Sequence, residues 1–256
     1  RRNIYDRSRF LSWLNRITLK RVERIVVLSP RLVSQFGPVL SDAGKISVVA
    51  NYADRRFFLS DTRIEEKHAS SPRRIVFFTN MIPEKGYREL AEAFKRLPRN
   101  VQDDVTVTFA GHFSDPSARR KFEKQLSDHP KMSYTGPLNG RKRFEFLKGA
   151  HFLVLPTYYP FEGQPLVVLE AYAAGCCVIA TQHGGIPEIF RDRENGLSLS
   201  APSVEELSTV LETALSMDRQ ELATMALLNA RKARREFSAE RFDKEILRLF
   251  EKVVRG

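Results

Sequence analysis

The sequence predicts an α/β fold, in which a doubly wound parallel sheet is preceded by the last elements of a second α/β domain. Three observations favour this fold. Short apolar runs alternate with amphipathic segments along most of the 256 residues. The runs are too apolar to face water on either side, which is typical of parallel strands covered by helices on both faces. No internal repeat or low-complexity tract interrupts the alternation.

One polar, aperiodic stretch divides the chain. We interpret residues 1–54 as the incomplete end of an N-terminal domain, residues 55–72 as a linker, and residues 73–256 as a second domain that includes the C-terminal helices. Pro72 closes the linker, since proline commonly marks the end of irregular structure. The chain begins with Arg1 and not with Met, from which we expect a fragment of a longer protein.

Eight apolar runs are predicted as strands, because each is short and most are rich in Val, Ile or Phe. In chain order they are RIVVLS (24–29), KISVVAN (45–51), RRIVFFTN (73–80), DVTVTFAG (104–111), MSYTGPL (132–138, a short strand and turn), HFLVLP (151–156), CVIATQ (177–182) and NGLSLS (195–200).

The amphipathic segments between and after these runs are predicted as helices. Ser29 is a favoured N-cap residue and Pro30 suits a first turn, so the first helix begins there. Leu90, Ala91 and Phe94 have the spacing of one apolar helix face. The predicted helices span residues 30–40, 87–97, 116–129, 139–150, a segment that begins near Pro165, 186–192, 204–216, 219–237 and 239–254.

Composition restricts the classes of function. Lys and Arg total 42 against 31 Asp and Glu, and the formal net charge of +11 is concentrated in residues 1–24 and 231–237. This excess favours anionic partners such as phosphorylated ligands, lipid head groups or nucleic acid. Proteins that bind RNA interleave aromatic and basic residues on a surface. No such pattern occurs, so we expect no nucleic-acid partner and keep a basic nucleic-acid-binding module as an alternative.

Targeting signals and cysteines indicate the compartment. The sequence has no run of eighteen apolar residues and no signal peptide, which predicts a cytoplasmic protein. The two cysteines, Cys176 and Cys177, are neighbours on a predicted strand and therefore point to opposite faces, so we expect no disulfide. We interpret both as small buried hydrophobic residues in a reducing compartment. A nucleophilic cysteine assisted by His183 is the alternative.

A polar loop follows the predicted strand 151–156 and leads into the next helix. In doubly wound folds, ligands bind outside the carboxyl ends of the strands, where this loop lies. The helix that begins near Pro165 would offer free N–H groups and a positive dipole end to a phosphate, and Gly163 would let the backbone come close to it. Glu170 stands where a carboxylate accepts the hydroxyls of a ribose. Glu162 is then left to meet hydroxyls beyond the phosphates.

The residues of this region resemble the donor-binding half of the family-four glycosyltransferases of GT-B fold. The mark of that family is a pair of glutamates separated by seven residues, as in Glu162 and Glu170. The resemblance extends over residues 22–256 through motifs in the same order. They are IVVLSP, ISVVAN followed by Asp54 and Phe57, PEKG with Lys85, AG with Gly111, EGQPLVVLEAYAAG, VIATQHGGIPE and ENGL.

The resemblance implies roles for these residues. The catalytic pair would be Glu162, placed at the transferred sugar, and Lys85, which would neutralise the donor diphosphate, while Glu170 would bind the ribose. The remaining residues implied at the donor site are Asn80, Gly111, Leu138 (at the base), Gly163, Gln164, Pro165 and Leu166. Such enzymes are metal-independent and retaining, and they use a nucleotide-diphosphate sugar and no further cofactor. They often act in bacterial polysaccharide or lipopolysaccharide synthesis, with a carbohydrate or lipid-linked acceptor.

The sequence departs from this family pattern in two respects. Thr79-Asn80 stands where the family has Gly-Arg, so Asn80 would donate a hydrogen bond to the diphosphate but no charge. The glycine-rich loop and the catalytic histidine of the acceptor-binding half are also absent. We therefore expect this chain alone to bind a donor without transferring its sugar.

Several alternatives stay open. A nucleotide-sugar epimerase shares the GT-B fold, and a catalytically inactive interaction module would also keep the binding motifs. We interpret His183 and His112 as hydrogen-bonded structural residues, with ligand contact as the alternative. Tyr158 and Tyr159 are as consistent with packing around the loop as with stacking on a sugar or base. No metal site is predicted, because no D-x-D ends a strand and the five histidines lack ligand spacing.

The N-terminal segment has an apolar face and a basic surround. The apolar residues are Phe10, Trp13, Leu14 and Ile17, and the basic ones are Arg7, Arg9, Arg16 and Lys20. One interpretation is a helix that packs on another domain. The other is an interfacial helix that holds the enzyme at an anionic surface, at the inner face of the membrane.

Overall fold

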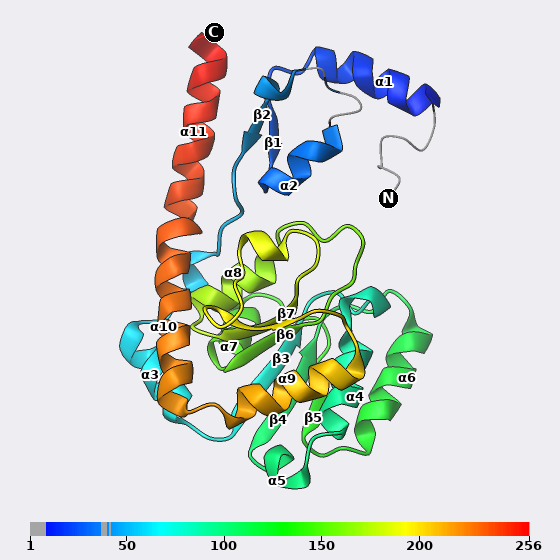
Figure 1. Cartoon of the computed structure of the whole chain (residues 1–256), viewed down its shortest axis with the longest axis vertical. Helices are drawn as coiled ribbons and strands as arrows, with labels where there is room; N and C mark the ends of the chain where they lie inside the picture. The colour runs from blue at the N-terminus through cyan, green and yellow to red at the C-terminus, as the bar shows by residue number, and fades with distance from the viewer. Residues whose placement is uncertain (1–8, 37–39, 41, 256) are drawn as a thin grey trace. The chain divides into compact units, whose positions relative to one another are not determined.

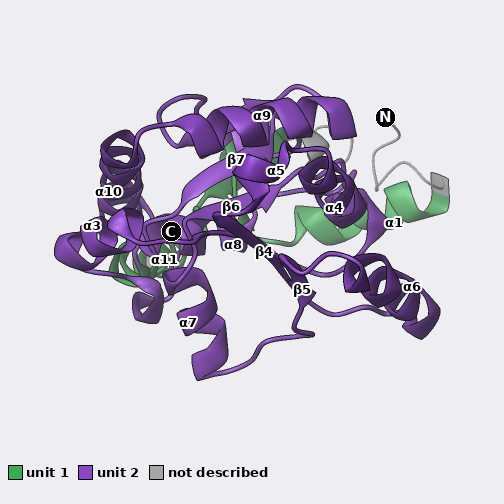
Figure 2. Cartoon of the chain, turned by 90° about the horizontal axis from the view of Figure 1, so that it is seen from below, with its two compact units in different colours: residues 1–51, 239–256 green, residues 52–238 purple. Residues whose placement is uncertain are grey.

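The structure is a computed structural model that describes residues 9–36, 40 and 42–255. Its contacts divide the chain into two compact units (Figures 1 and 2). Unit 1 comprises Arg1–Asn51 and Ala239–Gly256, and unit 2 comprises Tyr52–Ser238. The candidate site lies wholly in unit 2.

Unit 2 is built on a six-stranded sheet whose strands are all parallel, in the order β5-β4-β3-β6-β7-β8. The strands are β3 (Arg73–Phe78), β4 (Val105–Ala110), β5 (Met132–Tyr134), β6 (Phe152–Leu155), β7 (Cys177–Thr181) and β8 (Gly196–Leu199). The chain winds outward from β3 to β5, then returns to β6 on the other side of β3. This confirms the predicted doubly wound α/β fold and places a switch point between the carboxyl ends of β3 and β6.

Helices cover both faces of this sheet (Figure 2). The helices of unit 2 are α3 (Asp61–Ala69), α4 (Tyr87–Lys95), α5 (Arg99–Gln102), α6 (Pro116–Ser127), α7 (Arg141–Lys148), α8 (Leu166–Ala173), α9 (Val204–Ser216) and α10 (Arg219–Glu236). Helices α4 and α9 pack on each other, and α10 packs on α3 and α8. The strands are therefore covered by two helical layers, as their apolar character indicates.

An aromatic cluster fills the core between the sheet and the helices α4 and α6. The ring of Phe109 lies 5.0 Å from that of Phe122, which in turn lies 4.8 Å from Tyr87, both edge to face. All three side chains are buried. Rings in this geometry stabilise a core beyond the area that they bury, so the strands that carry the site rest on a rigid base.

The segment 55–72, which we interpreted as a linker, is ordered secondary structure. It contains a 3-10 turn, Arg55–Phe57, and helix α3, whose N-cap Ser60 accepts a hydrogen bond from the N–H of Arg63. Sequence pattern missed α3 because Ile64 is its one large apolar residue that is buried, while Lys67 and His68 are buried polar residues. The linker interpretation is therefore corrected.

Other boundaries also differ from the predictions. The segment predicted as a helix over 186–192 forms only the 3-10 turn Ile186–Glu188. The short helix α5 was not predicted. The last helix, α11 (Ala239–Arg255), groups with unit 1, whereas we had placed it with residues 73–238.

Unit 1 contains two parallel strands, β1 (Ile25–Val27) and β2 (Ile46–Val48). Its helices are α1 (Arg9–Lys20), α2 (Pro30–Val33) and α11, and its 3-10 turns are Ser34–Phe36 and Ala43–Lys45. The predicted helix over 30–40 is thus shorter, and its residues 37–39 lie outside the described residues. Nowhere in the described part of the chain is a helix long and apolar enough to cross a membrane.

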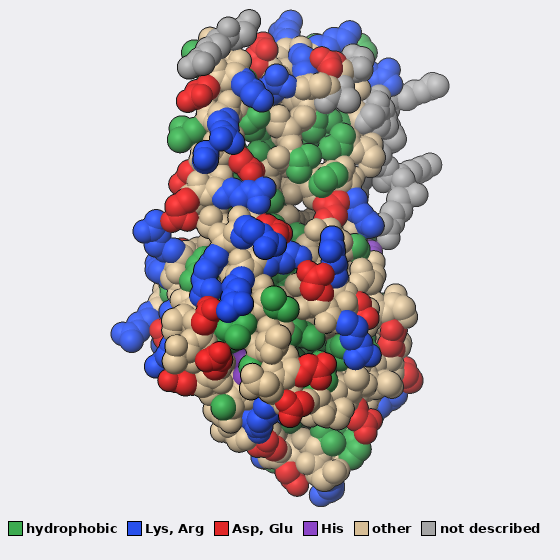
Figure 3. Space-filling model, turned by 60° about the vertical axis from the view of Figure 1, so that its left-hand side comes forward, with side chains coloured by type: hydrophobic (Ala, Val, Ile, Leu, Met, Phe, Trp, Pro, Cys, Tyr) green, Lys and Arg blue, Asp and Glu red, His purple; other side chains and the backbone are tan. Residues whose placement is uncertain are grey.

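Many Lys and Arg side chains lie on the side of the molecule that carries α3 and α10 (Figure 3). Two of them stabilise unit 2. Arg231 and Arg234 on α10 reach Asp61 on α3 at 3.0 and 2.9 Å. These two cations of the basic segment 231–237 therefore link α10 to α3.

Candidate functional site

A pocket of about 530 Å³ opens at the carboxyl ends of β3, β4 and β6. Eight of the ten residues predicted for the donor site line it: Asn80, Lys85, Gly111, Leu138, Glu162, Pro165, Leu166 and Glu170. The other two, Gly163 and Gln164, lie in the same loop and do not line it. Gln164 is buried, and a side chain added at Gly163 would meet open space.

Lys85 and Glu162 meet across the switch point of the sheet. Lys85 ends a 3-10 turn, Pro83–Lys85, that follows β3, and Glu162 lies in the loop that follows β6. The Nζ of Lys85 is 2.6 Å from Oε2 of Glu162, and the two side chains are only 12% and 5% exposed. The hydroxyl of Thr157 donates to the same oxygen at 2.8 Å. The pair is thus a buried, hydrogen-bonded ion pair at the floor of the pocket.

The backbone of the glutamate loop is fixed by a turn from β7. The N–H of Gly185 donates to the carbonyl of Glu162 at 3.1 Å. Gly184 has a φ of +58°, and a Cβ there would lie 2.2 Å from the same carbonyl oxygen. Only glycine fits so close an approach in this conformation, so the two glycines of HGG hold Glu162 in place.

Glu170 pairs with Arg143, a residue on α7 that sequence reasoning did not single out. The Glu170 side chain is almost fully buried on α8. Burial raises the pKa of Glu170 to about 7, and the nearby Asp54 adds to the rise while the charge and hydrogen bond of Arg143 oppose it. A carboxyl group with a pKa near 7 gains or loses its proton near neutral pH.

Asp54 and Phe57, two residues that carried the resemblance, lie near the ion pair of Arg143 and Glu170. Asp54 is the N-cap of the 3-10 turn Arg55–Phe57, and Phe57 ends that turn. The guanidinium of Arg143 lies 5.1 Å from the centre of the Phe57 ring. Asp54 caps the turn by accepting the N–H of Arg56 at 2.9 Å, and the Arg56 side chain pairs with it at 2.6 Å. The hydrogen bonds and charge of Arg56 outweigh the effect of burial and lower the pKa of Asp54 to about 2.

The opposite wall of the pocket belongs to the turns after β3 and β4. Gly111 has a φ of +155°, and a Cβ there would lie 1.8 Å from the carbonyl oxygen of Thr79. Any other residue at position 111 would push the two turns apart. Asn80 is exposed beside it, so its amide is available to a ligand.

The first turn of α8 faces this pocket. Pro165 stands at the N-cap and makes no side-chain hydrogen bond to the helix, and Leu166 and Val167 line the pocket. The leading N–H groups of α8 therefore donate no hydrogen bond to the side chain of the N-cap residue, and a helix N-terminus of this kind suits an anion.

The histidines and tyrosines weighed as ligand contacts fall into two groups. His112 lines the pocket and is exposed. His183 bonds to the carbonyl of Tyr159 at 2.8 Å, and the Tyr159 ring lies 5.1 Å from Nζ of Lys85, so both support the glutamate loop. Tyr158 does not line the pocket, and its N–H donates to the carbonyl of Glu84.

Cys176 and Cys177 are free thiols and both are buried. Burial raises the pKa of each thiol. A buried thiol of raised pKa is a poor nucleophile, so both cysteines are packing residues, as their apolar surroundings predicted. Among the described residues no group of three or more His, Cys, Asp or Glu side chains is arranged to hold a metal ion.

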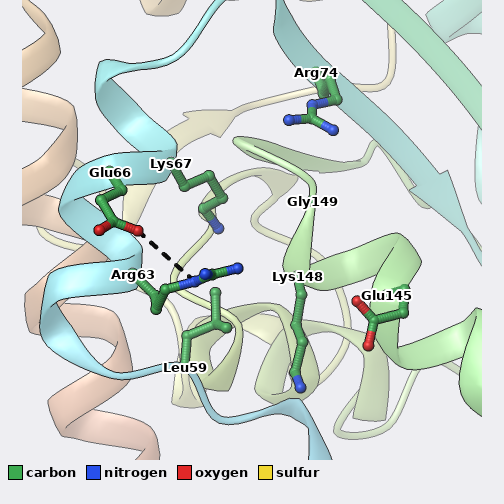
Figure 4. Close-up of a pocket in the computed structure, with 8 residues that line it drawn as sticks. All are labelled: Leu59, Arg63, Glu66, Lys67, Arg74, Glu145, Lys148 and Gly149. Carbon is green, nitrogen blue, oxygen red and sulfur yellow. Dashed lines mark ion pairs between the residues drawn. The ribbon is translucent and has the colours of Figure 1, made fainter.

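A second pocket of about 550 Å³ lies at the other end of the sheet, between α3 and α7 (Figure 4). Its wall includes Arg63, Lys67, Arg74 and Lys148. Figure 4 shows Arg63 paired with Glu66 and Lys67 pointing inward. Lys67 donates to the carbonyl of Ala174 at 2.7 Å and is therefore occupied in tying α3 to the end of α8. None of the motif residues lines this pocket, so it is not the candidate site.

The chain is similar to known proteins over most of its length. The family model for glycosyl transferases group 1 matches residues 60–233. A lipopolysaccharide 1,2-N-acetylglucosaminetransferase of Salmonella typhimurium is 28% identical over 191 residues, which cover 70% of this chain and 49% of that protein. A glycogen synthase of Mycobacterium tuberculosis is 24% identical over 204 residues, 80% of this chain and 47% of that protein. The chain spans about half the length of these curated relatives.

Solved structures share the fold. The structure of Anabaena Alr3699/HepE in complex with UDP-glucose matches with a TM-score of 0.77 at 18% identity and covers 96% of this chain and 68% of that one. Together with the family model, which matches more than half of the residues, this confirms both the predicted fold and the resemblance found in the sequence. The chain belongs to the glycosyl transferases group 1 family.

Proposed function

We propose that the pocket binds a nucleotide-diphosphate sugar and that the whole protein transfers the sugar to a carbohydrate or lipid-linked acceptor. One observation carries this proposal. Lys85, Glu162 and Glu170, which come from different segments of the chain, line a single pocket beside the first turn of α8. The arrangement offers a cation and helix N–H groups to phosphates, and carboxylates to hydroxyls.

The similar proteins support the same proposal. The structurally similar Anabaena protein was solved with UDP-glucose, and the Salmonella relative is a lipopolysaccharide N-acetylglucosaminetransferase by name. Both are consistent with a nucleotide-sugar donor and with a role in polysaccharide or lipopolysaccharide synthesis. Because the acceptor-side motifs do not occur in this sequence, we propose that the chain by itself binds the donor without transferring its sugar. Sugar transfer by the chain alone would contradict this.

We assign each residue one role. Glu170 accepts the ribose hydroxyls, Lys85 and the first turn of α8 face the diphosphate, and Glu162 faces the transferred sugar. Lys85 and Glu162 are then the catalytic pair. Transfer proceeds without a metal ion, because the cation and the helix N–H groups stabilise the departing diphosphate where a metal ion otherwise would. Retention at the anomeric carbon is proposed from the family resemblance. Asn80 donates a hydrogen bond to the same diphosphate.

A thermal-shift screen tests the proposal. The ligands are ADP, GDP, UDP, CDP and dTDP, their glucose conjugates where available, and a mixed-sequence oligonucleotide as the control for nucleic-acid binding. We expect at least one nucleoside diphosphate to raise the melting temperature, and no effect of the oligonucleotide at 0.15 M salt, where exposed charges are screened. Stabilisation by the oligonucleotide alone would favour the basic nucleic-acid-binding module instead.

The remaining alternative within enzymes is a nucleotide-sugar epimerase. It would convert the donor in the absence of any acceptor, whereas a transferase needs one. Incubating the whole protein with the donor alone, followed by analysis of the recovered nucleotide sugar, separates the two. Recovery of an epimerised donor would contradict the transferase proposal, and recovery of unchanged donor would support it.

We further propose that the enzyme works in the cytoplasm at the inner face of the membrane. On α1 the side chains of Phe10, Trp13, Leu14 and Ile17 are exposed, and Arg16 and Lys20 are also on this helix. Arg7 lies outside the described residues, and the Arg9 side chain is not described. An amphipathic basic helix of this kind suits an anionic lipid surface.

A further inference from the structure

Each acidic side chain at the pocket already has a cation beside it. Lys85 pairs with Glu162, and Arg143 pairs with Glu170. The two cations differ in access, since the Lys85 side chain is 12% exposed and that of Arg143 is 38% exposed. Among the described residues that line the pocket, Arg143 is therefore the positively charged side chain that a ligand reaches most easily.

Arg143 has hydrogen-bonding capacity to spare. Its Nη2 donates to Oε1 of Glu170, and within the described part of the protein its other N–H groups make no hydrogen bond. The Phe57 ring, which is fully buried, supports the guanidinium at 5.1 Å. Phe57 is itself held edge to face against Phe144, one residue further along α7, at 4.7 Å. The guanidinium is thus fixed, partly exposed and able to donate to a ligand.

The position of Arg143 in the pocket indicates which end of a nucleotide it would meet. It follows Pro137, Leu138 and Asn139, which also line the pocket, and its guanidinium pairs with Glu170, the residue assigned to the ribose. Lys85 and Asn80, which we assign to the diphosphate, follow β3 instead. Arg143 therefore faces the nucleoside half beside Glu170.

The charge of Arg143 also acts on Glu170 directly. The charged groups around that carboxylate are Arg143 on α7 and Asp54 at the cap of the 3-10 turn, and Lys85, Glu162 and His112 line the same pocket. Of these groups, Asp54 disfavours the ionised form of Glu170 and Arg143 favours it. Without Arg143 the buried carboxyl would hold its proton at neutral pH and would become a poor acceptor for two hydroxyls.

We propose that Arg143 is a positioning residue for the nucleoside, because it favours the ionised form of Glu170, orients that carboxylate toward the ribose and donates its free N–H groups to the same half of the ligand. This rests on the proposed function of the pocket. It predicts that Arg143, 27 positions before Glu170, determines how strongly the ribose hydroxyls are recognised and how that recognition depends on pH.

The test compares Arg143→Met, Arg143→Lys and the matched control Arg141→Met, which removes an exposed arginine from the same helix. The 256-residue chain is titrated by calorimetry with the best-binding member of ADP, GDP, UDP, CDP and dTDP and with its 2′,3′-dideoxy analogue, from pH 6 to 9. In parallel, ¹³C NMR of Glu-labelled chain follows the titration of the Glu170 carboxyl.

We expect the wild-type chain at pH 7 to prefer the ribonucleotide over its dideoxy analogue by about tenfold or more, as for loss of a charge-assisted hydrogen bond. Arg143→Met should reduce this preference to near unity at pH 7 and restore it at pH 9. Its Glu170 titration should move upward by about one pH unit or more. Arg143→Lys should keep most of the wild-type pH profile, and Arg141→Met all of it.

Two failures are distinguishable. If the folded Arg143→Met chain binds nucleotide with the wild-type preference and pH profile, this inference is overturned while the proposed function stands. If the wild-type chain binds none of the five nucleoside diphosphates, the proposed function falls and this inference with it. An unchanged Glu170 titration in Arg143→Met would also overturn the inference, whatever the ligand.

Discussion

The buried pair of Lys85 and Glu162 makes a quantitative prediction about stability. The charges are 2.6 Å apart and nearly inaccessible to water. At an effective dielectric constant of about 20, their attraction is about 6 kcal/mol before the cost of removing both charges from water is counted. Replacing Lys85 with Met leaves a buried carboxylate whose one remaining side-chain partner among the described residues is the Thr157 hydroxyl. Breaking a buried pair in this way costs about 3–5 kcal/mol, a large part of the total for a domain.

A double-mutant cycle measures this cost by urea unfolding followed by circular dichroism. We expect Lys85→Met to lose about 3–5 kcal/mol, and the double variant Lys85→Met/Glu162→Gln to recover at least about 2 kcal/mol of that loss. The matched control is Lys95→Met, which breaks a partly exposed pair with Glu92 at 3.4 Å and should cost at most about 1 kcal/mol. Equal losses for Lys85→Met and Lys95→Met, or no recovery in the double variant, would refute the buried-pair geometry.

Four further predictions follow from the site, the core and the first helix. Glu170→Ala should weaken nucleoside diphosphate binding about tenfold or more, and much less for a 2′,3′-dideoxy nucleotide, which calorimetry checks; equal losses would exclude the ribose role. Asn80→Arg should tighten binding of a diphosphate more than of a monophosphate, and weaker binding by a folded variant would contradict our placement of the diphosphate. Burial lowers the pKa of His151 to about 3 and of His68 to about 4. The free energy of unfolding should therefore be constant above pH 6.5 and decrease below it, by about 2 kcal/mol per histidine at pH 5. A urea midpoint that does not change from pH 7 to pH 5 would be inconsistent with this. The whole protein should co-sediment at low salt with vesicles that contain anionic lipid and not with neutral vesicles, and the Trp13→Ala variant should co-sediment less. If the protein co-sediments with neither kind of vesicle, α1 is a purely structural helix.

The sequence predicted the sheet and most of the pocket because both follow from local pattern. Apolar runs such as 151–156 read as buried parallel strands, and the carboxyl ends of such strands meet at one edge of the sheet. The loops that follow β3, β4 and β6 therefore had to bring Lys85, Gly111 and Glu162 together, as the structure shows.

Neither the contact of Arg143 with Glu170 nor helix α3 could be predicted from these local patterns, and each has a physical reason. The segment RKRFEFLK offers three consecutive cations, and which of them reaches Glu170 depends on the rotation of α7 about its axis, which packing on Phe57 fixes. Helix α3 is specified by a cap and by buried polar contacts, notably Lys67 to Ala174, rather than by an apolar stripe. Hydrophobic periodicity carries no signal for contacts of that kind.

The central claim is that the pocket at the carboxyl ends of β3, β4 and β6 binds the donor nucleotide. A crystal structure of the chain with the nucleoside diphosphate that stabilises it most tests this directly. We predict ribose hydroxyls within about 3.2 Å of the Glu170 carboxylate and phosphate oxygens near Lys85 Nζ and the first turn of α8, in hydrogen-bonding geometry. A nucleotide bound elsewhere, such as in the pocket between α3 and α7, with Glu170 and Lys85 untouched, would contradict the account.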